Sequence, residues 1–229
     1  EAALAFKTRV ALYEGSWQKY HAGSVFGTPG ADPNKYFKAC TDAAEELMSG
    51  NYQVGIYNDY YKLFGLDNMS SANEVLLYRA YNIKDGLSND VQYSTTFAPF
   101  EIGITWSLVS SYLGKNGEPY DYLTLASTTK GNAFLTKISQ DVDPRLHATV
   151  WAPGDVVSVS KGQVFGKPGV DQVSSMLNPT GFQLKKCSNP NSPGAGATGG
   201  GNSETGYILF RYGEVLLNYA EALYELKGD

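Results

Sequence analysis

The C-terminal stretch, residues 211–229, constrains the fold most, because it carries the pattern of an amphipathic helix. Apolar side chains recur at the i, i+3, i+4, i+7 spacing of one helix face: Tyr212, Val215, Leu216, Tyr219, Leu223 and Leu226. The opposite stripe is polar and is expected to face water, with Glu214, Asn218, Glu221 and Glu225. Lys227 lies where the helix dipole favours a cation, and Gly228 suits a helix terminator. Such a helix must bury its apolar face, so we expect it to pack on other helices.

Two further helices are predicted near the start of the chain. The first runs from Glu1 to about Gly15. The second has Asp32 as its N-cap and Pro33 at its first position, and it closes at Gly50. Alanines on both segments would let the two helices approach closely, as in tetratricopeptide-like hairpins. The linker 17–31 is longer than that repeat normally has, so the match to the repeat consensus is loose.

From residue 52 onward the helical periodicity is lost. The pattern predicts short helices at 58–64 and 106–113, the second capped by Thr105, and a strand at 74–81. Asp143 before Pro144 indicates a helix start or a tight turn. Weak alternation favours short strands at 148–151 and 156–159. Residues 82–104 read as a loop, and 188–206, rich in Asn, Pro, Ser and Gly, as a flexible surface loop.

These segments predict three parts. Residues 1–50 would form a helical hairpin, 51–206 a loop-rich subdomain, and 207–229 the first helix of a further pair. The sequence begins with a pattern typical of a helix interior, without a cap before it. It ends after a helix whose apolar face no later helix in the sequence could cover. We therefore expect an internal piece of a longer protein.

Composition excludes some functions. The net charge is −5 and there is no Lys/Arg-rich run, which argues against a nucleic-acid partner. No stretch approaches the roughly 18 apolar residues of a membrane-spanning helix. Charged residues make up only 18% and aromatic residues 13%, including 17 Tyr, which favours a surface that contacts neutral partners.

Several motifs together resemble one family. Arg-Tyr-Gly-Glu-Val-Leu-Leu-Asn-Tyr-Ala-Glu-Ala at 211–222 resembles the late signature of the SusD/RagB family, with Gly213 where Ala is usual. Five earlier pieces occur in the family's order. The first two are Ala-Leu-Tyr-Glu-Gly-Ser-Trp at 11–17 and Asn-Glu-Val-Leu-Leu at 73–77. The other three are the Thr-x-x-Leu-Val-x-x-Tyr helix at 105–112 with its Gly-x-Pro exit, the Asp-Pro-Arg-Leu block at 143–146, and Gly-Phe-Gln-Leu-Lys-Lys at 181–186.

The resemblance implies a mainly α fold, in which tetratricopeptide-like helical hairpins (an α-α superhelix) support a loop-rich irregular subdomain. The matched motifs are then scaffold rather than site. Core positions are expected at Leu108, Val109, Leu146, Leu216 and Leu217. Arg145 and Arg211 are expected to anchor carboxylates or carbonyls.

The function implied by the resemblance is non-catalytic binding. An outer-membrane lipoprotein of Bacteroidetes-type bacteria would hold an oligosaccharide or polysaccharide nutrient at the cell surface. It would deliver that glycan to a SusC-like TonB-dependent transporter. Three alternatives stay open: a peptide ligand, as in the RagB branch, a surface glycoside hydrolase, and a pure scaffold.

The residues give little support to catalysis or to a bound cofactor. Asp141, Asp143 and Asp155 cluster in sequence, but Asp143 is better explained as a cap before Pro144. His21 and His147 are isolated, so no metal site is predicted. The glycine-rich run 194–201 lacks a Gly-Lys-Ser/Thr end and reads as a mobile linker. Cys40 fits a buried thiol, and its pairing with Cys187 stays open.

Exposed aromatic side chains are the remaining candidates for ligand contact, because the C–H faces of sugar rings stack on them. The candidates are Tyr93, Phe97, Phe100, Trp106 and Trp151, with Trp17 as a further ring. Trp106 and Trp151 also suit core positions. The stretch 93–100, expected to lie in a loop beside Asn89 and Gln92, is the preferred patch.

Overall fold

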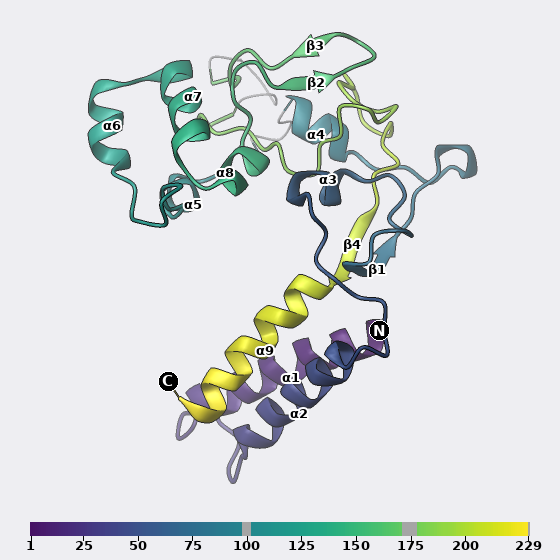
Figure 1. Cartoon of the computed structure of the whole chain (residues 1–229), viewed down its shortest axis with the longest axis vertical. Coiled ribbons are helices and arrows are strands. Elements are labelled where there is room, and N and C mark those ends of the chain that lie inside the picture. Colours follow the sequence, from purple (N-terminus) through teal and green to yellow (C-terminus); the bar gives the residue numbers. More distant parts are fainter. Residues whose placement is uncertain (98–101, 171–177, 229) are drawn as a thin grey trace. The chain divides into compact units, whose positions relative to one another are not determined.

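A computed structural model describes residues 1–97, 102–170 and 178–228, and it confirms a mainly helical fold (Figure 1). The chain divides into two compact units. The helical unit consists of residues 1–58, 69–79 and 207–229. The loop-rich unit consists of residues 59–68 and 80–206. The long middle segment is thus inserted between two parts of the helical unit.

The helical unit is built from α1 (Ala2–Tyr20), α2 (Pro33–Met48) and α9 (Tyr212–Lys227), which lie side by side (Figure 1). The predicted Asp32 cap is confirmed, since its side chain accepts a hydrogen bond from the Lys35 N–H. The first helix continues past Gly15, where its end was predicted. A Cβ at Gly15 would lie 2.8 Å from the Phe37 ring, so this glycine permits close helix packing instead of ending α1.

Small side chains dominate the core of the helical unit, as the alanine pattern predicts. The buried positions are Ala5, Ala11, Phe37, Cys40, Ala44, Leu47, Val215 and Ala222. Cys40 is a fully buried free thiol, and burial raises its pKa to about 11. Cys187 is also a free thiol in the structure.

The prediction for the polar stripe of α9 was wrong in part, because that stripe faces α1. Glu214 pairs with Arg9, Glu225 accepts from Lys19, and the Asn218 side chain donates to the Thr8 hydroxyl. The side of α1 that faces α9 carries small and polar residues, so the polar side chains of α9 form ion pairs and hydrogen bonds with it. Leu217, predicted as a core residue, is 66% exposed.

A two-stranded ribbon completes the helical unit. Strand β1 (Val75–Arg79) pairs antiparallel with β4 (Tyr207–Arg211), with Val75 opposite Arg211. The predicted strand is therefore present over most of its length. Arg211 binds the buried carboxylate of Glu74 at 2.7 Å, as expected for an anchoring arginine. A Cβ at Gly213 would crowd this pair, at 2.3 Å from Arg211 Nη1 and 2.9 Å from Glu74 Oε1, which explains the glycine there.

The loop-rich unit contains short helices and one small hairpin. Its helices are α3 (Tyr60–Gly65), the 3₁₀ turn η1 (Ile83–Asp85), α4 (Val91–Phe97), α5 (Trp106–Ser110), α6 (Tyr122–Thr128), α7 (Gly131–Asp141) and α8 (Pro144–Thr149). Strands β2 (Val156–Ser158) and β3 (Gln163–Val164) form the hairpin. The core includes the predicted Val109 and Leu146, whereas Leu108 is 43% exposed.

Two secondary-structure predictions for this unit were wrong. Residues 148–149 end helix α8 instead of opening a strand, because the Asp143 cap and Pro144 start a helix that runs for more than one turn. Within 82–104, α4 replaces part of the predicted loop. The Asn89 side chain accepts from the Val91 N–H at the start of α4, and the Thr95 and Thr96 hydroxyls donate to the Gln92 carbonyl.

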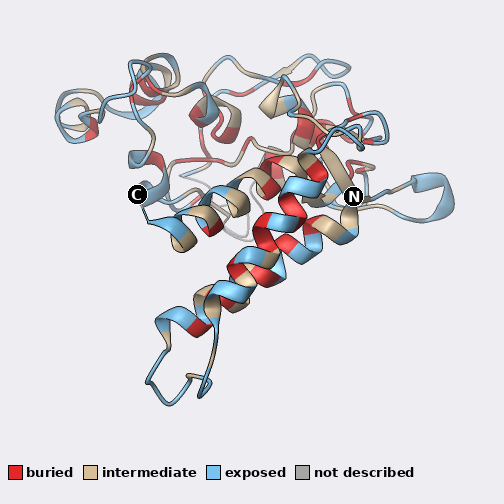
Figure 2. Cartoon of the chain, turned by 60° about the horizontal axis from the view of Figure 1, so that its bottom comes forward, coloured by how far each residue is buried: buried red, intermediate tan, exposed pale blue. Residues whose placement is uncertain are grey.

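The stretch 188–206 was also misjudged, since much of it is buried. Figure 2 colours the described residues by burial. Ser192, Ser203 and Thr205 are no more than 2% exposed. The Asp67 carboxylate accepts from the Ser192 and Thr205 hydroxyls. The segment has almost no apolar side chains. Side-chain hydrogen bonds therefore hold it in place, where apolar packing would hold a segment of ordinary composition.

Candidate functional site

The preferred aromatic patch lies on helix α4. Tyr93 and Phe97 are one turn apart, both half-buried, with ring centroids separated by 5.9 Å. The i, i+4 spacing places them on the same face of the helix. Phe100, the third predicted aromatic of this patch, lies outside the described residues. The structure therefore offers a pair of neighbouring rings where the sequence predicted a loop.

Buried polar side chains fix the C-terminal end of α4. The Gln183 amide donates to the carbonyls of Thr95 and Thr96, at 3.1 and 2.8 Å. The Trp151 indole N–H donates to the same Thr95 carbonyl, at 2.8 Å. Side chains distant in sequence thus satisfy the carbonyls of Thr95 and Thr96. Phe97 is thus attached to a helix end whose position is set by long-range hydrogen bonds.

A hollow opens beside Phe97, with about 250 Å³ accessible to water. Its lining combines apolar and polar groups: Thr96, Phe97, Val157, Gln163, Val164, Phe165, Gly166, Lys167, Gly169 and Gln183. Most of these residues come from the β2–β3 hairpin and the segment that follows it. Pockets for drug-sized ligands range from about 300 to 1,000 Å³. The hollow therefore suits a single ring or a short part of a longer ligand.

Trp106 lies at the edge of the main core of the loop-rich unit. Its ring contacts Tyr122, Phe134 and Phe182, with centroid separations of 6.1, 6.2 and 6.0 Å. The residue is nevertheless 39% exposed. The ring therefore packs on the core and still presents surface, and contact with a ligand stays a prediction.

Trp151 is a core residue with 1% exposure. Its ring stacks on Phe165 at 5.6 Å, and the Lys185 ammonium lies 5.5 Å from its centroid. Since its N–H also donates to the end of α4, this tryptophan has no free face for a ligand. It positions α4 and the wall of the hollow.

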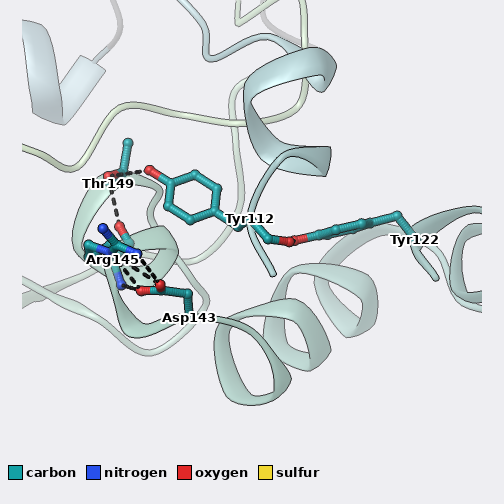
Figure 3. Close-up of polar contacts among 5 residues, drawn as sticks. All are labelled: Tyr112, Tyr122, Asp143, Arg145 and Thr149. Carbon is teal, nitrogen blue, oxygen red and sulfur yellow. Dashed lines mark hydrogen bonds and ion pairs between the residues drawn. The ribbon is translucent and has the colours of Figure 1, made fainter. Parts of the chain in front are cut away.

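The Asp-Pro-Arg-Leu block is a structural cluster (Figure 3). Asp143 accepts from the Arg145 backbone N–H and binds the Arg145 guanidinium. That guanidinium holds the pKa of the Asp143 carboxyl below its usual range. The Thr149 hydroxyl donates to the Arg145 carbonyl and lies 3.3 Å from the Tyr112 hydroxyl. Arg145 thus anchors a carboxylate, as predicted.

Tyr122 joins this cluster from helix α6, since its hydroxyl donates to the Tyr112 carbonyl (Figure 3). Burial raises the pKa of Tyr122 to about 12, so the hydroxyl stays protonated and able to donate.

The remaining carboxylates of this region are paired. Asp141 binds Lys137 and accepts from the Tyr120 hydroxyl. Asp155 accepts from His147 Nε2 at 2.8 Å and from the buried Lys185 ammonium at 2.9 Å. Burial of Asp155 by itself would raise its pKa, but the contacts with His147, the Ala152 N–H and Lys185 outweigh burial and lower it.

The part of the chain that the structure describes contains neither a metal cluster nor a membrane-spanning helix. No group of three or more His, Cys, Asp or Glu side chains suitable for a metal ion occurs within 1–97, 102–170 and 178–228. Across those ranges, no helix combines the length and apolar character needed to cross a bilayer.

Sequence reasoning missed the polar lining of the hollow. Sequence motifs of a ligand site are absent around Gln163, Lys167 and Gln183. Nothing in the local sequence therefore predicts that these three residues line the same hollow. Two local signals indicate the hairpin there: the predicted strand at 156–159, and the turn glycines Gly154 and Gly162, both at positive φ.

Comparison with curated proteins gives no match. Among solved structures, the chain resembles a SusD-like protein from Bacteroides fragilis with a TM-score of 0.64 and 18% identity. That match covers 98% of this chain and 43% of the other. A second protein, solved with a xylogluco-oligosaccharide, has a TM-score of 0.51 and 15% identity, over 97% of this chain and 39% of the other.

The chain therefore spans about two fifths of the length of these solved relatives, and identities this low establish the fold alone. Family membership rests on the sequence itself. The SusD family profile matches residues 73–229, which is more than half of the chain. The matched region contains the ribbon of the helical unit, the whole Asp-Pro-Arg-Leu cluster, α4 and α9. The chain belongs to the SusD family.

Proposed function

We propose that the protein binds an oligosaccharide or polysaccharide nutrient at the cell surface, without chemical change, and delivers it to a SusC-like TonB-dependent transporter. The observation that carries this proposal is the family match over residues 73–229. The relative that was solved with a xylogluco-oligosaccharide supports a saccharide as the class of ligand.

The face of α4 that carries Tyr93 and Phe97 is the proposed contact surface. An aromatic ring at the edge of a hollow can stack on the C–H face of a sugar ring. Gln163 and Lys167 in the same hollow offer polar groups for hydroxyls, and Phe165 closes its apolar side. Trp106, 39% exposed, is a second stacking ring in the proposal. The volume of the hollow suits one residue of a longer glycan.

The absence of catalysis is part of the proposal. Glycoside hydrolysis needs two carboxyl groups that flank the scissile bond, about 5 to 9.5 Å apart. Asp141, Asp143 and Asp155 are each engaged by a cation. A carboxylate held this way has a lowered pKa, which makes it a poor general acid at neutral pH.

Location and partner follow from the family in this proposal. The protein would be held at the outer-membrane surface by a lipid anchor and would associate with its transporter there. Surface labelling of intact cells, and recovery of a TonB-dependent transporter with the tagged native protein, test these two statements. A protein shielded from the label in intact cells contradicts the location.

Affinity electrophoresis against a panel of polysaccharides, oligosaccharides and peptides tests the ligand class. Retardation by at least one glycan, with no product after prolonged incubation, is the expected result. Retention by peptides alone would favour the RagB-like alternative. Release of shorter sugars would replace binding by hydrolysis. No interaction with any glycan or peptide would contradict capture.

A further inference from the structure

Gln183 is a buried polar side chain that lines the hollow beside Phe97. It is 4% exposed, and its amide nitrogen donates to the carbonyls of Thr95 and Thr96, at 3.1 and 2.8 Å. A carboxamide nitrogen carries two hydrogens, so both are already used. Because a carbonyl can only accept, these two contacts also fix which end of the amide is nitrogen and which is oxygen.

The oxygen of the same amide, Gln183 Oε1, has no protein partner. In the part of the chain that the structure describes, no N–H or O–H group donates to it. The enclosed side-chain atoms that lack a partner there are Ser16 Oγ and Gln18 Oε1, so Gln183 Oε1 is not sealed in the interior. Since the hollow is the opening that Gln183 lines, this oxygen is accessible from the hollow. An amide oxygen on a buried side chain that lacks a donor costs free energy, which a donor on a ligand would recover.

Thr96 adds a second acceptor to the same lining. Its hydroxyl donates to the Gln92 carbonyl at 2.8 Å, so the proton is used and Oγ1 can only accept a further hydrogen bond. The Thr96 carbonyl holds the Gln183 amide, which brings the two side chains together. The wall of the hollow thus carries two neighbouring side chains whose own hydrogens are all engaged.

We propose that Gln183, with Thr96 beside it, determines which ligand enters the hollow, by accepting a hydrogen bond from a free sugar hydroxyl. This inference rests on the proposed function, since it takes the ligand to be a glycan. A hydroxyl can donate to Gln183 Oε1, whereas an ether or ester oxygen in the same place cannot. The hollow therefore admits a sugar residue that is unsubstituted at one particular hydroxyl. It rejects the same residue when that oxygen is methylated, acylated or part of a glycosidic bond.

Charge in the lining favours a hydroxyl over a cationic donor. An ammonium group could also donate to two acceptors beside an aromatic ring. However, Lys167 lines the same hollow, and the described residues of the lining include no carboxylate that would offset a second cation. A ligand ammonium would therefore meet a like charge, which opposes its binding. The donor that fits this hollow is neutral.

Calorimetric titration of the intact protein tests the inference. The first probes are gluco-, xylo-, manno-, galacto-, xylogluco- and uronic acid oligosaccharides. The tightest binder is then replaced by analogues changed at one hydroxyl at a time. A deoxy analogue lacks both donor and acceptor there, whereas a deoxyfluoro analogue lacks only the donor. At one position, both analogues should bind about tenfold or more weakly than the parent oligosaccharide.

Three outcomes overturn the inference, and they are distinguishable. Full affinity for every deoxy analogue would show that the hollow does not select a hydroxyl. Recovery of affinity in the deoxyfluoro analogue at the sensitive position would show that the protein donates there. No binding of any parent oligosaccharide would contradict the proposed function itself, and this inference with it.

Two variants assign the effect to these side chains. Gln183→Met keeps the length of the side chain without the amide, so it should bind the parent and the sensitive deoxy analogue with nearly equal affinity. A purely structural role for Gln183 would weaken both ligands in parallel, and an unchanged ratio of the two affinities overturns the inference. Thr96→Val should also reduce the ratio, and it serves if Gln183→Met does not fold, because the Thr95 hydroxyl still donates to the Gln92 carbonyl. Thr128→Val, at an exposed hydroxyl that donates to a carbonyl within α6, is the matched control and should leave the ratio unchanged.

Discussion

The helical unit and the loop-rich unit are each stabilised internally by a different kind of interaction. Three helices of the first pack through small residues, and Ala5, Ala44 and Ala222 are almost fully buried at their contacts. The second also has an apolar core, but its loops are held by buried polar side chains such as Gln92 and Gln183. Periodic packing thus gives a regular support, whereas specific hydrogen bonds place an irregular surface.

This difference matters for binding. The proposed ligand surface lies in the loop-rich unit, where each hydrogen bond sets the place of one segment. Loops positioned in this way can vary without loss of the underlying core. The following substitutions test whether the two units depend on these different interactions.

The largest effect is expected in the helical unit, at Glu74. This carboxylate is 3% exposed and accepts from Arg211 and from the Tyr57 N–H, each at 2.7 Å. Glu74→Ala removes the buried carboxylate that Arg211 and the Tyr57 N–H bind, and should cost about 3–5 kcal/mol of unfolding free energy in urea. Asp42→Ala, which breaks an exposed pair with Lys38, should cost about 1 kcal/mol or less. Equal losses would contradict the role of burial.

In the loop-rich unit, Gln92→Leu should have the next largest effect. The Gln92 side chain donates to the Cys187 carbonyl and the Thr205 hydroxyl, and it accepts from the Asn189 N–H. Loss of these buried contacts should cost about 2–4 kcal/mol. Hydrogen exchange should rise first in 187–206. An unchanged exchange pattern would show that this segment is held by other contacts. Gln53→Leu, at an exposed residue, is the control.

Close packing in the helical unit is tested by Gly15→Val. The added side chain meets Phe37, which is fully buried and cannot move away freely. Overpacking of this kind costs about 1–3 kcal/mol. Gly55→Val introduces the same side chain where no atom lies within 4 Å, and should be close to neutral. Thermal unfolding compares the two, and a smaller loss at Gly15 than at Gly55 would refute the packing argument.

The smallest effect concerns two half-buried carboxyls of the loop-rich unit. The pKa of Asp155 is lowered in the folded state, so its contribution to stability is present above the unfolded value of about 3.9 and is lost as pH falls through the folded value. Asp155→Asn should therefore cost about 1 kcal/mol at neutral pH and flatten the acid side of the stability profile.

Asp67 should behave in the opposite way. Burial raises the pKa of Asp67, despite hydrogen bonds from Thr205 and Ser192. Its stabilising contribution is complete below the unfolded pKa and is lost as pH rises through the folded value. Asp67→Asn should then be neutral or stabilising at pH 7. A loss larger than that of Asp155→Asn would contradict this assignment.

Local signals in the sequence account for most of the regular structure. Asp32 before Pro33, Thr105, and Asp143 before Pro144 each start a helix where predicted, because a cap acts on its own first turn. The periodic α9 is present over its predicted length, although part of its polar stripe faces α1. Such features depend on residues close together in the sequence, so they can be predicted without knowledge of the fold.

The irregular parts could not be predicted, because their positions depend on residues distant in sequence. Helix α4 and the stretch 188–206 are fixed by side chains distant in sequence, among them Gln183 and Asp67. Of the site, Tyr93 and Phe97 were predicted from their residue type alone. The hollow beside Phe97 depends on the β2–β3 hairpin, whose approach to α4 no local pattern encodes.

Calorimetric titration with the glycan that responds in the panel tests glycan capture most directly. The account predicts saturable binding that Phe97→Ala weakens by about tenfold or more, in line with the loss of one stacked ring. Tyr224→Ala, which removes a ring 59% exposed on α9, should leave the affinity unchanged. Saturable binding that is indifferent to Phe97, or no glycan binding by the intact protein, would contradict capture at this surface.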